Sequence, residues 1–269
     1  MGSFEFKKKF GQNFLKDEHL LAQIVEKSGT MSGEVVVEIG AGKGALTTFL
    51  AKSAKTVCAF EIDKTLQDFL TEKFAGSNVN LIFEDVMSWT DEKLNELVGE
   101  KFRLVANLPY YITSPIITRF LQNPNLISAT VMVQREVADR ITAKPKSKDY
   151  GVLTIMCNAF GRAQKMLDVG REMFYPVPKV DSAVVRIDKI ERKTDYDFGK
   201  FIAFVKSAFL MRRKKLSANL ENCLILSKGE IEQELKELGF TENVRAEELS
   251  LEDFERLYKK TRNKIKLDC

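Results

Sequence analysis

Short apolar runs alternate with amphipathic stretches in the first half of the chain. The apolar runs predict five strands, at residues 34–40, 55–63, 78–86, 102–109 and 128–134. The amphipathic stretches predict helices at 44–54, from about 64 to 74, and from 136 onward. Runs this apolar are typical of strands buried on both faces, as in a parallel sheet covered by helices. The repeated strand–helix unit therefore predicts an α/β fold with a doubly wound, mostly parallel sheet.

The pattern changes near residue 175. Tyr175-Pro176-Val177-Pro178 is a stiff, extended segment, and residues 181–190 alternate like a strand, which predicts a short hairpin or an antiparallel edge strand. Beyond residue 191 the apolar spacing of three and four predicts helices at 198–210, 230–239 and 251–262. Ser250 is the expected N-cap of the last helix. We expect two domains, an α/β domain of residues 1–190 and a small all-helical domain of residues 191–269.

A glycine-rich turn, Glu38-Ile39-Gly40-Ala41-Gly42-Lys43-Gly44, follows the first predicted strand. Glycines let the backbone turn sharply and let a ligand approach closely. Glu61 lies 21 residues beyond Gly40 (61 − 40 = 21), at the end of the second strand, where a carboxylate can accept both hydroxyls of a ribose. Asp85 ends the third strand and is placed to meet an adenine edge. Three adjacent strand ends therefore predict a nucleoside-containing ligand.

The identity of that ligand follows from the spacing and from the charge. The turn reads G-x-G-x-G, whereas a dinucleotide fold shows G-x-G-x-x-G, and no P-loop Lys-Ser/Thr follows it. A carboxylate-rich site suits a cationic sulfonium better than a phosphate. S-adenosyl-L-methionine is therefore favoured over NAD, and the alternative is a plain strand–helix turn with surface acids.

Asn107-Leu108-Pro109-Tyr110 directly follows the fourth predicted strand. The exocyclic amine of adenine is a poor nucleophile because its lone pair is delocalised into the ring. Two acceptors that grip both N–H bonds would direct the lone pair at a methyl group, and the Asn107 side-chain oxygen and the Pro109 carbonyl are candidates. Tyr110 could stack on the ring, so the chemistry would be mainly positioning. The alternative is that Asn107 caps a turn and Tyr110 packs in the core.

Composition excludes several other chemistries. His19 is the only histidine and the four cysteines form no CxxC pair, so a Ser-His-Asp triad and a metal site are not expected. No apolar run approaches the roughly 20 residues that cross a bilayer, and no secretory signal is visible, so we expect a cytoplasmic protein without a membrane partner. The net charge is only +4, but cations cluster at residues 144–148 and 212–215. Such clusters indicate a polyanionic partner or, equally, a solvated surface.

These motifs together resemble the ribosomal RNA adenine dimethyltransferases, and most closely their bacterial small-subunit members. The resemblance spans residues 10–187 and is carried by the stretches FGQNFL, VEIGAGKGALT, FEID, EDV, ANLPYYITSPI and FYPVPKVDSAVVRI, with FLMRRKKLSANL (209–220) similar to the family's C-terminal region. It implies a Rossmann-like, S-adenosyl-L-methionine-dependent catalytic domain and a helical domain that binds RNA. The implied reaction is N6,N6-dimethylation of two adjacent adenosines in a hairpin loop near the 3′ end of small-subunit rRNA, on a late assembly particle.

The resemblance also assigns roles to residues. Asn13 and Leu15 would contact the methyl donor, and the donor pocket would be completed by Gly40, Glu61, Asp85 and Asn107. Phe174 would stack on the target base opposite Tyr110. The RNA backbone would be held by Arg212, Arg213, Lys214 and Lys215. We expect the protein to act as a monomer.

Three other functions remain open at this point. A large-subunit dimethyltransferase of the antibiotic-resistance type shares the motifs and the chemistry. A DNA adenine or protein amide methyltransferase could use a similar Asn-x-Pro-Tyr. The protein could also act mainly as a non-catalytic ribosome assembly factor.

Overall fold

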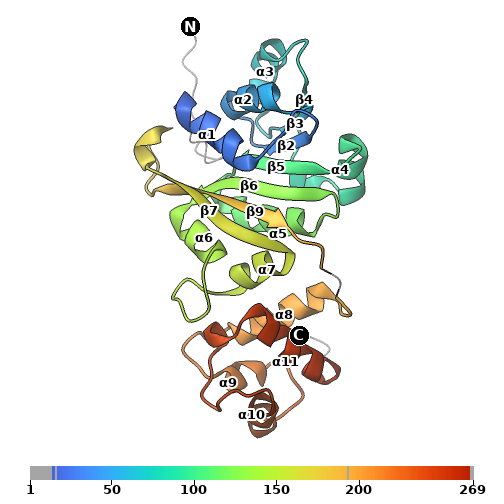
Figure 1. Cartoon of the computed structure of the whole chain (residues 1–269), viewed down its shortest axis with the longest axis vertical. Helices are drawn as coiled ribbons and strands as arrows, with labels where there is room; N and C mark the ends of the chain where they lie inside the picture. Colours follow the sequence, from blue (N-terminus) through green and yellow to red (C-terminus); the bar gives the residue numbers. More distant parts are fainter. Residues whose placement is uncertain (1–13, 16, 193, 267–269) are drawn as a thin grey trace. The chain divides into compact units, whose positions relative to one another are not determined.

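The computed structural model describes residues 14–15, 17–192 and 194–266 (Figure 1). The chain divides into two compact units. The α/β unit comprises the residues up to Ala138 and Gly161–Ile190, and the helical unit comprises Asp139–Phe160 and the residues from Glu191 onward. The division after residue 190 is where the sequence predicts it. Residues 139–160 differ from the prediction, because they belong to the helical unit although they precede two strands of the sheet.

The α/β unit contains a seven-stranded sheet in the order β4-β3-β2-β5-β6-β9-β7. Its strands are β2 (Val35–Ile39), β3 (Thr56–Phe60), β4 (Val79–Ile82), β5 (Phe102–Asn107), β6 (Leu126–Gln134), β7 (Gly161–Val169) and β9 (Ser182–Lys189). The neighbours among β2 to β6 are all parallel. Every residue of β2 is buried, as expected for a central strand covered on both faces. The five predicted strands and the doubly wound, mostly parallel sheet are therefore confirmed.

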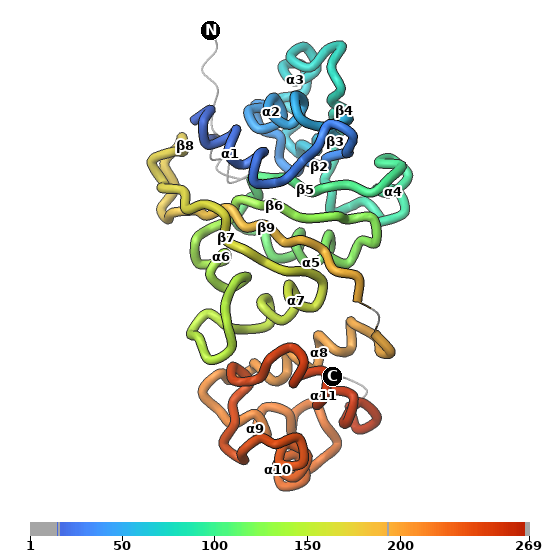
Figure 2. The backbone as a smooth tube through the Cα atoms, viewed as in Figure 1, coloured from blue at the N-terminus to red at the C-terminus, as the bar shows by residue number. Residues whose placement is uncertain are grey.

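The two antiparallel strands differ in part from the prediction. The strand expected at 181–190 is β9, and it is antiparallel to both of its neighbours. It is not an edge strand, because β7 pairs along its outer side. The sequence did not reveal β7, since this strand is exposed or half-buried over most of its length and so lacks an apolar run. Between β6 and β7 the chain passes through residues 139–160 (Figure 2).

Helices cover both faces of the sheet (Figure 1). Those of the α/β unit are α1 (Glu18–Ser28), α2 (Ala45–Ser53), α3 (Gln67–Lys73), α4 (Asp91–Val98) and α5 (Thr113–Gln122), and α6 (Arg135–Ile141) follows β6. On one face α1 and α2 pack against Val36 and Val105. On the other face the ring of Phe120 in α5 meets that of Phe102 edge-on, at 6.2 Å between centroids. The parallel strands are thus held as a layer between helices, with their carboxyl ends free to form a site.

A second, short sheet joins two segments that are far apart in the sequence. β1 (Phe14–Leu15) pairs antiparallel with β8 (Phe174–Tyr175), and Leu15 lies opposite Phe174. The segment to which the resemblance assigns donor contacts therefore lies beside the segment to which it assigns base stacking.

The helical unit consists of α7 (Val152–Phe160), α8 (Phe198–Ala208), α9 (Leu216–Leu220), α10 (Lys228–Glu237) and α11 (Leu251–Thr261). The three helices predicted after residue 191 are confirmed as α8, α10 and α11, and Ser250 caps α11 by accepting the Asp253 N–H at 3.2 Å. Aromatic and aliphatic side chains from all five helices form one apolar core. No described helix in either unit is both long and apolar enough to cross a membrane.

Candidate active site

A cavity of about 500 Å³ opens in the α/β unit at the carboxyl ends of β2, β3 and β5. Most of the predicted site residues line it, namely Leu15, Gly40, Glu61, Asp85, Asn107, Pro109 and Tyr110. Phe174 does not line it, and Asn13 lies outside the described residues. The cavity lies where open α/β sheets bind ligands, at the edge that the carboxyl ends of the strands share. These separate motifs therefore line one cavity, and the role of each residue in it stays a prediction.

The glycine turn adopts a backbone conformation that residues with a side chain rarely adopt. Gly40, Gly42 and Gly44 have φ values of 79°, 58° and 71°, in the left-handed region that glycine adopts without strain. A Cβ at Gly44 would also lie 2.6 Å from the ring of Phe74. A Cβ at Gly40 would lie 3.7 Å from the carbonyl oxygen of Asn107. The turn therefore lies directly against the Asn107 segment, and the two motifs form one wall.

Glu61 locks this turn to the end of β3. Its Oε2 accepts the Gly42 N–H at 2.7 Å, and its Oε1 accepts the Asp63 N–H at 2.8 Å. Burial raises the pKa of the carboxyl, and the two backbone N–H groups counteract that rise. Each carboxylate oxygen has a second lone pair, so the group can hold the turn and still accept a hydroxyl of a ligand.

Glu38 is the most unusual charge of the cavity wall. The residue is 1% exposed, and its Oε2 has no hydrogen-bond partner among the described residues. Burial raises its pKa to about 8, although a hydrogen bond with Thr47 counteracts part of this rise, and the neighbouring Glu61 adds a smaller rise. A buried carboxylate oxygen without a hydrogen-bond partner destabilises the fold unless a ligand provides one. The buried Glu38 side chain therefore suits a ligand that carries positive charge. In the sequence, Glu38 precedes the glycine turn, but its position alone did not indicate a specific role.

Asp85 lies on the exposed side of the cavity. Its Oδ1 accepts the Met87 N–H at 2.9 Å and so begins the short 3-10 turn Val86–Ser88. The side chains of Met87 and Ile62, which also line the cavity, are partly exposed. Apolar side chains beside a free carboxylate oxygen suit a flat heterocycle with a polar edge. Contact between Asp85 and adenine stays a prediction.

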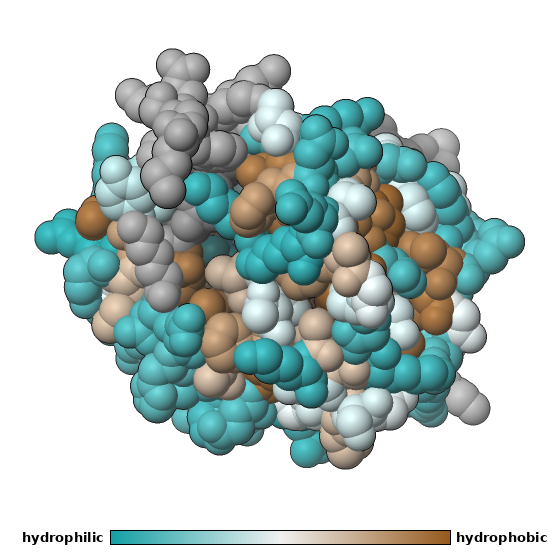
Figure 3. Space-filling model, turned by 90° about the horizontal axis from the view of Figure 1, so that it is seen from above, coloured by the Kyte–Doolittle hydropathy of each residue, from teal (hydrophilic) through white to brown (hydrophobic). Residues whose placement is uncertain are grey.

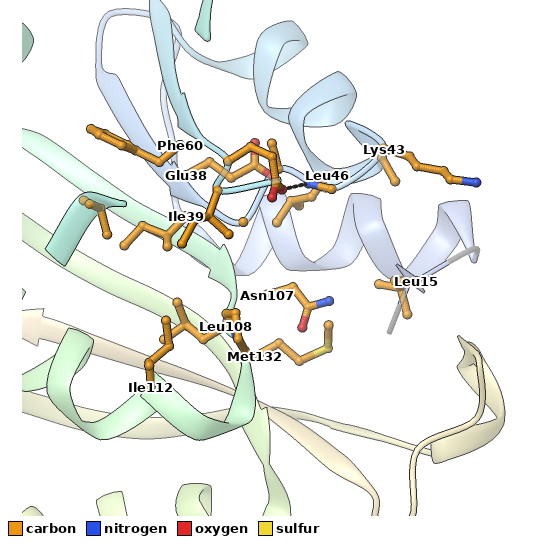
Figure 4. Close-up of a pocket in the computed structure, with 18 of the residues that line it drawn as sticks. Leu15, Glu38, Ile39, Lys43, Leu46, Phe60, Asn107, Leu108, Ile112 and Met132 are labelled. Atoms are coloured by element: carbon orange, nitrogen blue, oxygen red, sulfur yellow. Dashed lines mark hydrogen bonds between the residues drawn. The ribbon is translucent and has the colours of Figure 1, made fainter. Parts of the chain in front are cut away.

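Asn107 is the last residue of β5 and lies opposite Met132 of β6 (Figure 4). The carbonyl of Pro109 already accepts two hydrogen bonds, from the Ile112 N–H at 3.2 Å and from the Thr113 hydroxyl at 3.1 Å. These bonds close the 3-10 turn Tyr110–Ile112 and use both lone pairs of the oxygen. The predicted role of the Pro109 carbonyl is thus not supported by its contacts.

The preceding carbonyl is in a different situation. Leu108 lines the cavity, and its oxygen accepts no hydrogen bond from the described residues. Of the two backbone carbonyls next to Asn107 in the motif, the Leu108 carbonyl is therefore better able than the Pro109 carbonyl to accept a hydrogen bond from a ligand. The sequence could not distinguish them, because the difference depends on hydrogen bonds made by Ile112 and Thr113.

Tyr110 is fixed from the antiparallel part of the sheet. Its hydroxyl lies 2.8 Å from the Oγ of Ser182, the fully buried first residue of β9. Burial raises the pKa of the phenol, which therefore stays protonated at neutral pH. Ser182 was missed from the sequence, where it is an ordinary polar residue at the start of a strand.

Three further aromatic residues, Phe174, Tyr111 and Tyr175, are candidates for contact with a base. Phe174 is 3% exposed and packs in the core with Leu15 and residues of α1 and α2. Tyr111 and Tyr175 line the cavity and are 61% and 49% exposed. In the space-filling view from above, hydrophobic side chains reach the surface among hydrophilic ones (Figure 3). Stacking by Phe174 stays a prediction, and it requires the ring to leave the core.

The predicted RNA-binding block lies in the helical unit. Arg213 and Lys214 are exposed, and Lys215 is half-buried at the start of α9. Arg212 differs, because its guanidinium hydrogen-bonds to the carbonyls of Lys148 and Tyr150. The four residues of the block therefore differ in exposure and in their contacts with the protein. That the block binds RNA stays a prediction.

Two solved structures of RNA-modifying enzymes are similar to this chain over nearly its whole length. The dimethyladenosine transferase from Plasmodium falciparum superposes with a TM-score of 0.80 at 26% identity, covering 94% of this chain and 99% of that one. The 23S rRNA methyltransferase ErmE superposes with a TM-score of 0.71 at 28% identity, covering 93% of this chain and all of that one. Both likenesses include the helical unit as well as the sheet, since each spans nearly the whole chain.

Relatives in sequence are more similar still. The ribosomal RNA small subunit methyltransferase A of Clostridium acetobutylicum is 41% identical over 261 residues, covering 95% of this chain and 93% of that protein. The protein of the same name from Fusobacterium nucleatum is 40% identical, with coverages of 95% and 97%. The family model described as ribosomal RNA adenine dimethylase matches residues 3–263. Sequence, fold and cavity thus agree, and the chain belongs to the ribosomal RNA adenine dimethylase family.

Proposed function

We propose that this protein uses S-adenosyl-L-methionine to dimethylate the N6 amines of two adjacent adenosines in a hairpin loop near the 3′ end of small-subunit rRNA. As a member of its family it is a methyltransferase that acts on adenine of rRNA. The observation that carries the proposal is that one cavity combines two sets of groups. It holds the carboxylates suited to a nucleoside donor and the Asn107-Leu108 acceptors suited to an adenine amine.

The donor end of the cavity fits S-adenosyl-L-methionine by its chemistry. The bound donor supplies an electrophilic methyl group on a cationic sulfonium. Glu61 would accept the ribose hydroxyls, Asp85 would meet the adenine edge, and Leu15 would cover the apolar side. Glu38 presents a buried carboxylate oxygen that has no hydrogen-bond partner among the described residues, and a cationic ligand would favour the ionised form of this side chain.

The acceptor end would orient the amine. The Asn107 side-chain oxygen and the Leu108 carbonyl would accept the two N–H bonds and so direct the nitrogen lone pair at the methyl group. Tyr110, held by Ser182, would stack on the ring. When the N–C bond forms and the C–S bond breaks, the amine loses one proton. No described histidine lines the cavity, so this proton would leave to water and the protein would contribute by positioning.

The small-subunit substrate is favoured over the large-subunit alternative by degree of similarity. Relatives named for the small subunit are about 40% identical to this chain, whereas the 23S rRNA methyltransferase ErmE is 28% identical. We further propose that the protein acts as a monomer in the cytoplasm, on a late assembly particle, with the helical unit contacting RNA. A DNA or protein amide substrate and a purely structural role in assembly are less well supported, because neither accounts for this family membership.

The test is methylation of purified, undermethylated small subunits with tritiated donor, followed by identification of the labelled nucleosides. We expect N6,N6-dimethyladenosine from small subunits and none from large subunits or DNA. Asn107→Ala should abolish labelling while the variant still binds the particle. Gln122→Ala, which removes an exposed amide at the end of α5, should not change labelling. Labelling of large subunits alone would replace the proposal with the alternative, and unchanged labelling by Asn107→Ala would refute the mechanism.

A further inference from the structure

We propose that Tyr111 and Tyr175, two exposed residues that line the cavity, form a second base site, which holds the adenosine next to the one that is being methylated. The inference rests on the proposed function, because it needs an RNA substrate whose target base is extruded into the cavity. It adds a binding site for an unstacked base, separate from the Asn107-Leu108 acceptors and from the donor end.

The exposed tyrosines of this chain gather at the cavity. The chain has six tyrosines, and all of them lie among the described residues. Tyr111 and Tyr175 are 61% and 49% exposed, and both line the cavity. The other four are buried or half-buried, namely Tyr110, Tyr150, Tyr196 and Tyr258. A tyrosine ring is therefore left in solvent only where the cavity opens.

The backbone at Tyr111 is held in place although its ring is exposed. The 3-10 turn Tyr110–Ile112 is closed by a backbone hydrogen bond to the Pro109 carbonyl at 3.2 Å, and α5 follows it directly. The ring of Tyr110 is held by the 2.8 Å contact of its hydroxyl with Ser182. The Tyr111 hydroxyl makes no hydrogen bond with the described residues. The Tyr111 ring therefore extends from a fixed point of the backbone and stays accessible to a ligand.

Tyr175 is presented by the short strand β8. Its backbone pairs with that of Phe14 in β1. Successive side chains of a strand point to opposite sides, and the preceding Phe174 packs in the core, so Tyr175 points outward. The segment after Tyr175 leads to Ser182, which holds the Tyr110 hydroxyl. The two exposed rings thus come from segments that meet at this hydroxyl contact.

The chemistry of the two rings suits a base of single-stranded RNA. A tyrosine ring stacks on any base because every base has an aromatic face, while the tyrosine hydroxyl can remain in water. Extrusion of one nucleotide also removes stacking from its neighbour, which costs free energy. A ring at the opening of the cavity replaces part of that stacking. In the proposed reaction both adjacent adenosines enter the acceptor site in turn, so the base inside it has the other adenosine directly beside it.

The first experiment is a double-mutant cycle between protein and RNA. Small subunits are reconstituted with undermethylated rRNA that has an abasic site in place of one or the other adjacent adenosine, and methylation of the remaining adenosine is measured. Tyr111→Leu and Tyr175→Leu remove the aromatic face but keep an apolar side chain. On normal subunits each variant should raise KM about 5- to 100-fold, which is the loss expected for one stacked base. On at least one of the abasic subunits, variants and wild type should have the same KM.

Matched variants control for other roles of the two rings. Phe69→Leu changes a ring on α3 that is as exposed as Tyr175 but does not line the cavity, and it should leave KM unchanged. Tyr111→Phe keeps the stacking face and should also have the wild-type KM. Donor affinity in calorimetry and the midpoint of urea unfolding should be the same for every variant. A loss of donor affinity in Tyr111→Leu would place this ring at the donor end and overturn the proposal.

The second experiment does not depend on methylation. Small subunits that carry 5-iodouridine in place of either adenosine are irradiated with the bound protein, since an iodinated base couples to an aromatic ring that stacks on it. We expect cross-links to Tyr111 or Tyr175, identified by mass spectrometry of the peptides.

The outcomes separate the second base site from the proposed function. The site is refuted if neither tyrosine is cross-linked, or if the leucine variants raise KM equally on normal and on both abasic subunits, even when the wild type methylates normally. Wild-type protein that cross-links at these tyrosines but does not methylate small subunits would support the site and refute the function.

Discussion

Replacing Glu38 by glutamine should make the stability of the α/β unit less sensitive to pH. The buried carboxyl has its pKa raised from 4.5 to about 8, chiefly by burial. Between these two pH values the folded chain keeps a proton that the unfolded chain has lost. Stability therefore falls as the pH rises through this window, and the full loss is reached above pH 8. Glutamine has the same shape and no ionisation, so it lacks this contribution.

The magnitude follows from the size of the window. A rise in pKa from 4.5 to about 8 corresponds to about 5 kcal/mol, at ~1.4 kcal/mol for each pH unit. This is an upper value, because local opening or water entry would stabilise the charged form. It is nevertheless comparable to the total stability of many domains, which is about 5–15 kcal/mol. The difference in unfolding free energy between Glu38→Gln and wild type should therefore be smallest near pH 5. It should be several kcal/mol larger at pH 9.

Urea unfolding of the donor-free protein at pH 5 to 9 measures this gap. Trp89 is the single tryptophan of the chain and meets the ring of Phe60 edge-on, so its fluorescence reports on the α/β unit. Glu96→Gln, at an exposed carboxyl on α4, is the matched control and should follow the wild type at every pH. A constant gap between Glu38→Gln and wild type would show that Glu38 is ionised in the folded chain, which would remove the basis for its role toward a cationic ligand.

Three further predictions concern the cavity. Glu61→Gln should weaken donor binding about 10- to 100-fold in calorimetry, because one backbone N–H of the turn loses its charged acceptor, and rRNA affinity should not change. Ser182→Ala should lower kcat several-fold while donor affinity and the KM for small subunits stay the same, since only the orientation of Tyr110 is loosened; a normal kcat would contradict this. Phe174→Ala should lose about 3–5 kcal/mol of stability in urea unfolding if the ring is a core residue, whereas Tyr175→Ala should raise KM without a stability loss. A slow but fully stable Phe174→Ala protein would restore the stacking role predicted from the sequence.

The sequence was sufficient for those features that depend on local pattern. The parallel strands β2 to β6 are recognisable because both of their faces are buried, and the glycine turn is recognisable because only glycine adopts its backbone easily. The strand ends then place Glu61, Asp85 and Asn107 at one edge, since the carboxyl ends of parallel strands lie together. These residues line the same cavity in the structure.

Features that depend on distant contacts could not be predicted. β7 is visible only through its pairing with β9, because its own residues are largely exposed. Nothing near Ser182 in the sequence points to Tyr110, which is 72 residues away. Arg212 and Arg213 lie side by side in the same basic block, yet Arg212 hydrogen-bonds to the carbonyls of Lys148 and Tyr150. In each case the deciding information is a tertiary hydrogen bond or strand pair, which a linear pattern does not contain.

The assignment of residues 139–160 to the helical unit has a consequence for dissecting this protein. A fragment that begins at residue 191 would lack α7, which supplies Ile155 and Met156 to the core of that unit. A fragment that ends at residue 190 would keep α7 without the residues of α8 and α11 that pack against it. Truncation at the apparent domain boundary would therefore leave apolar surface uncovered in both pieces. To study the α/β unit alone, residues 139–160 should be replaced by a short linker, so that β6 and β7 stay connected.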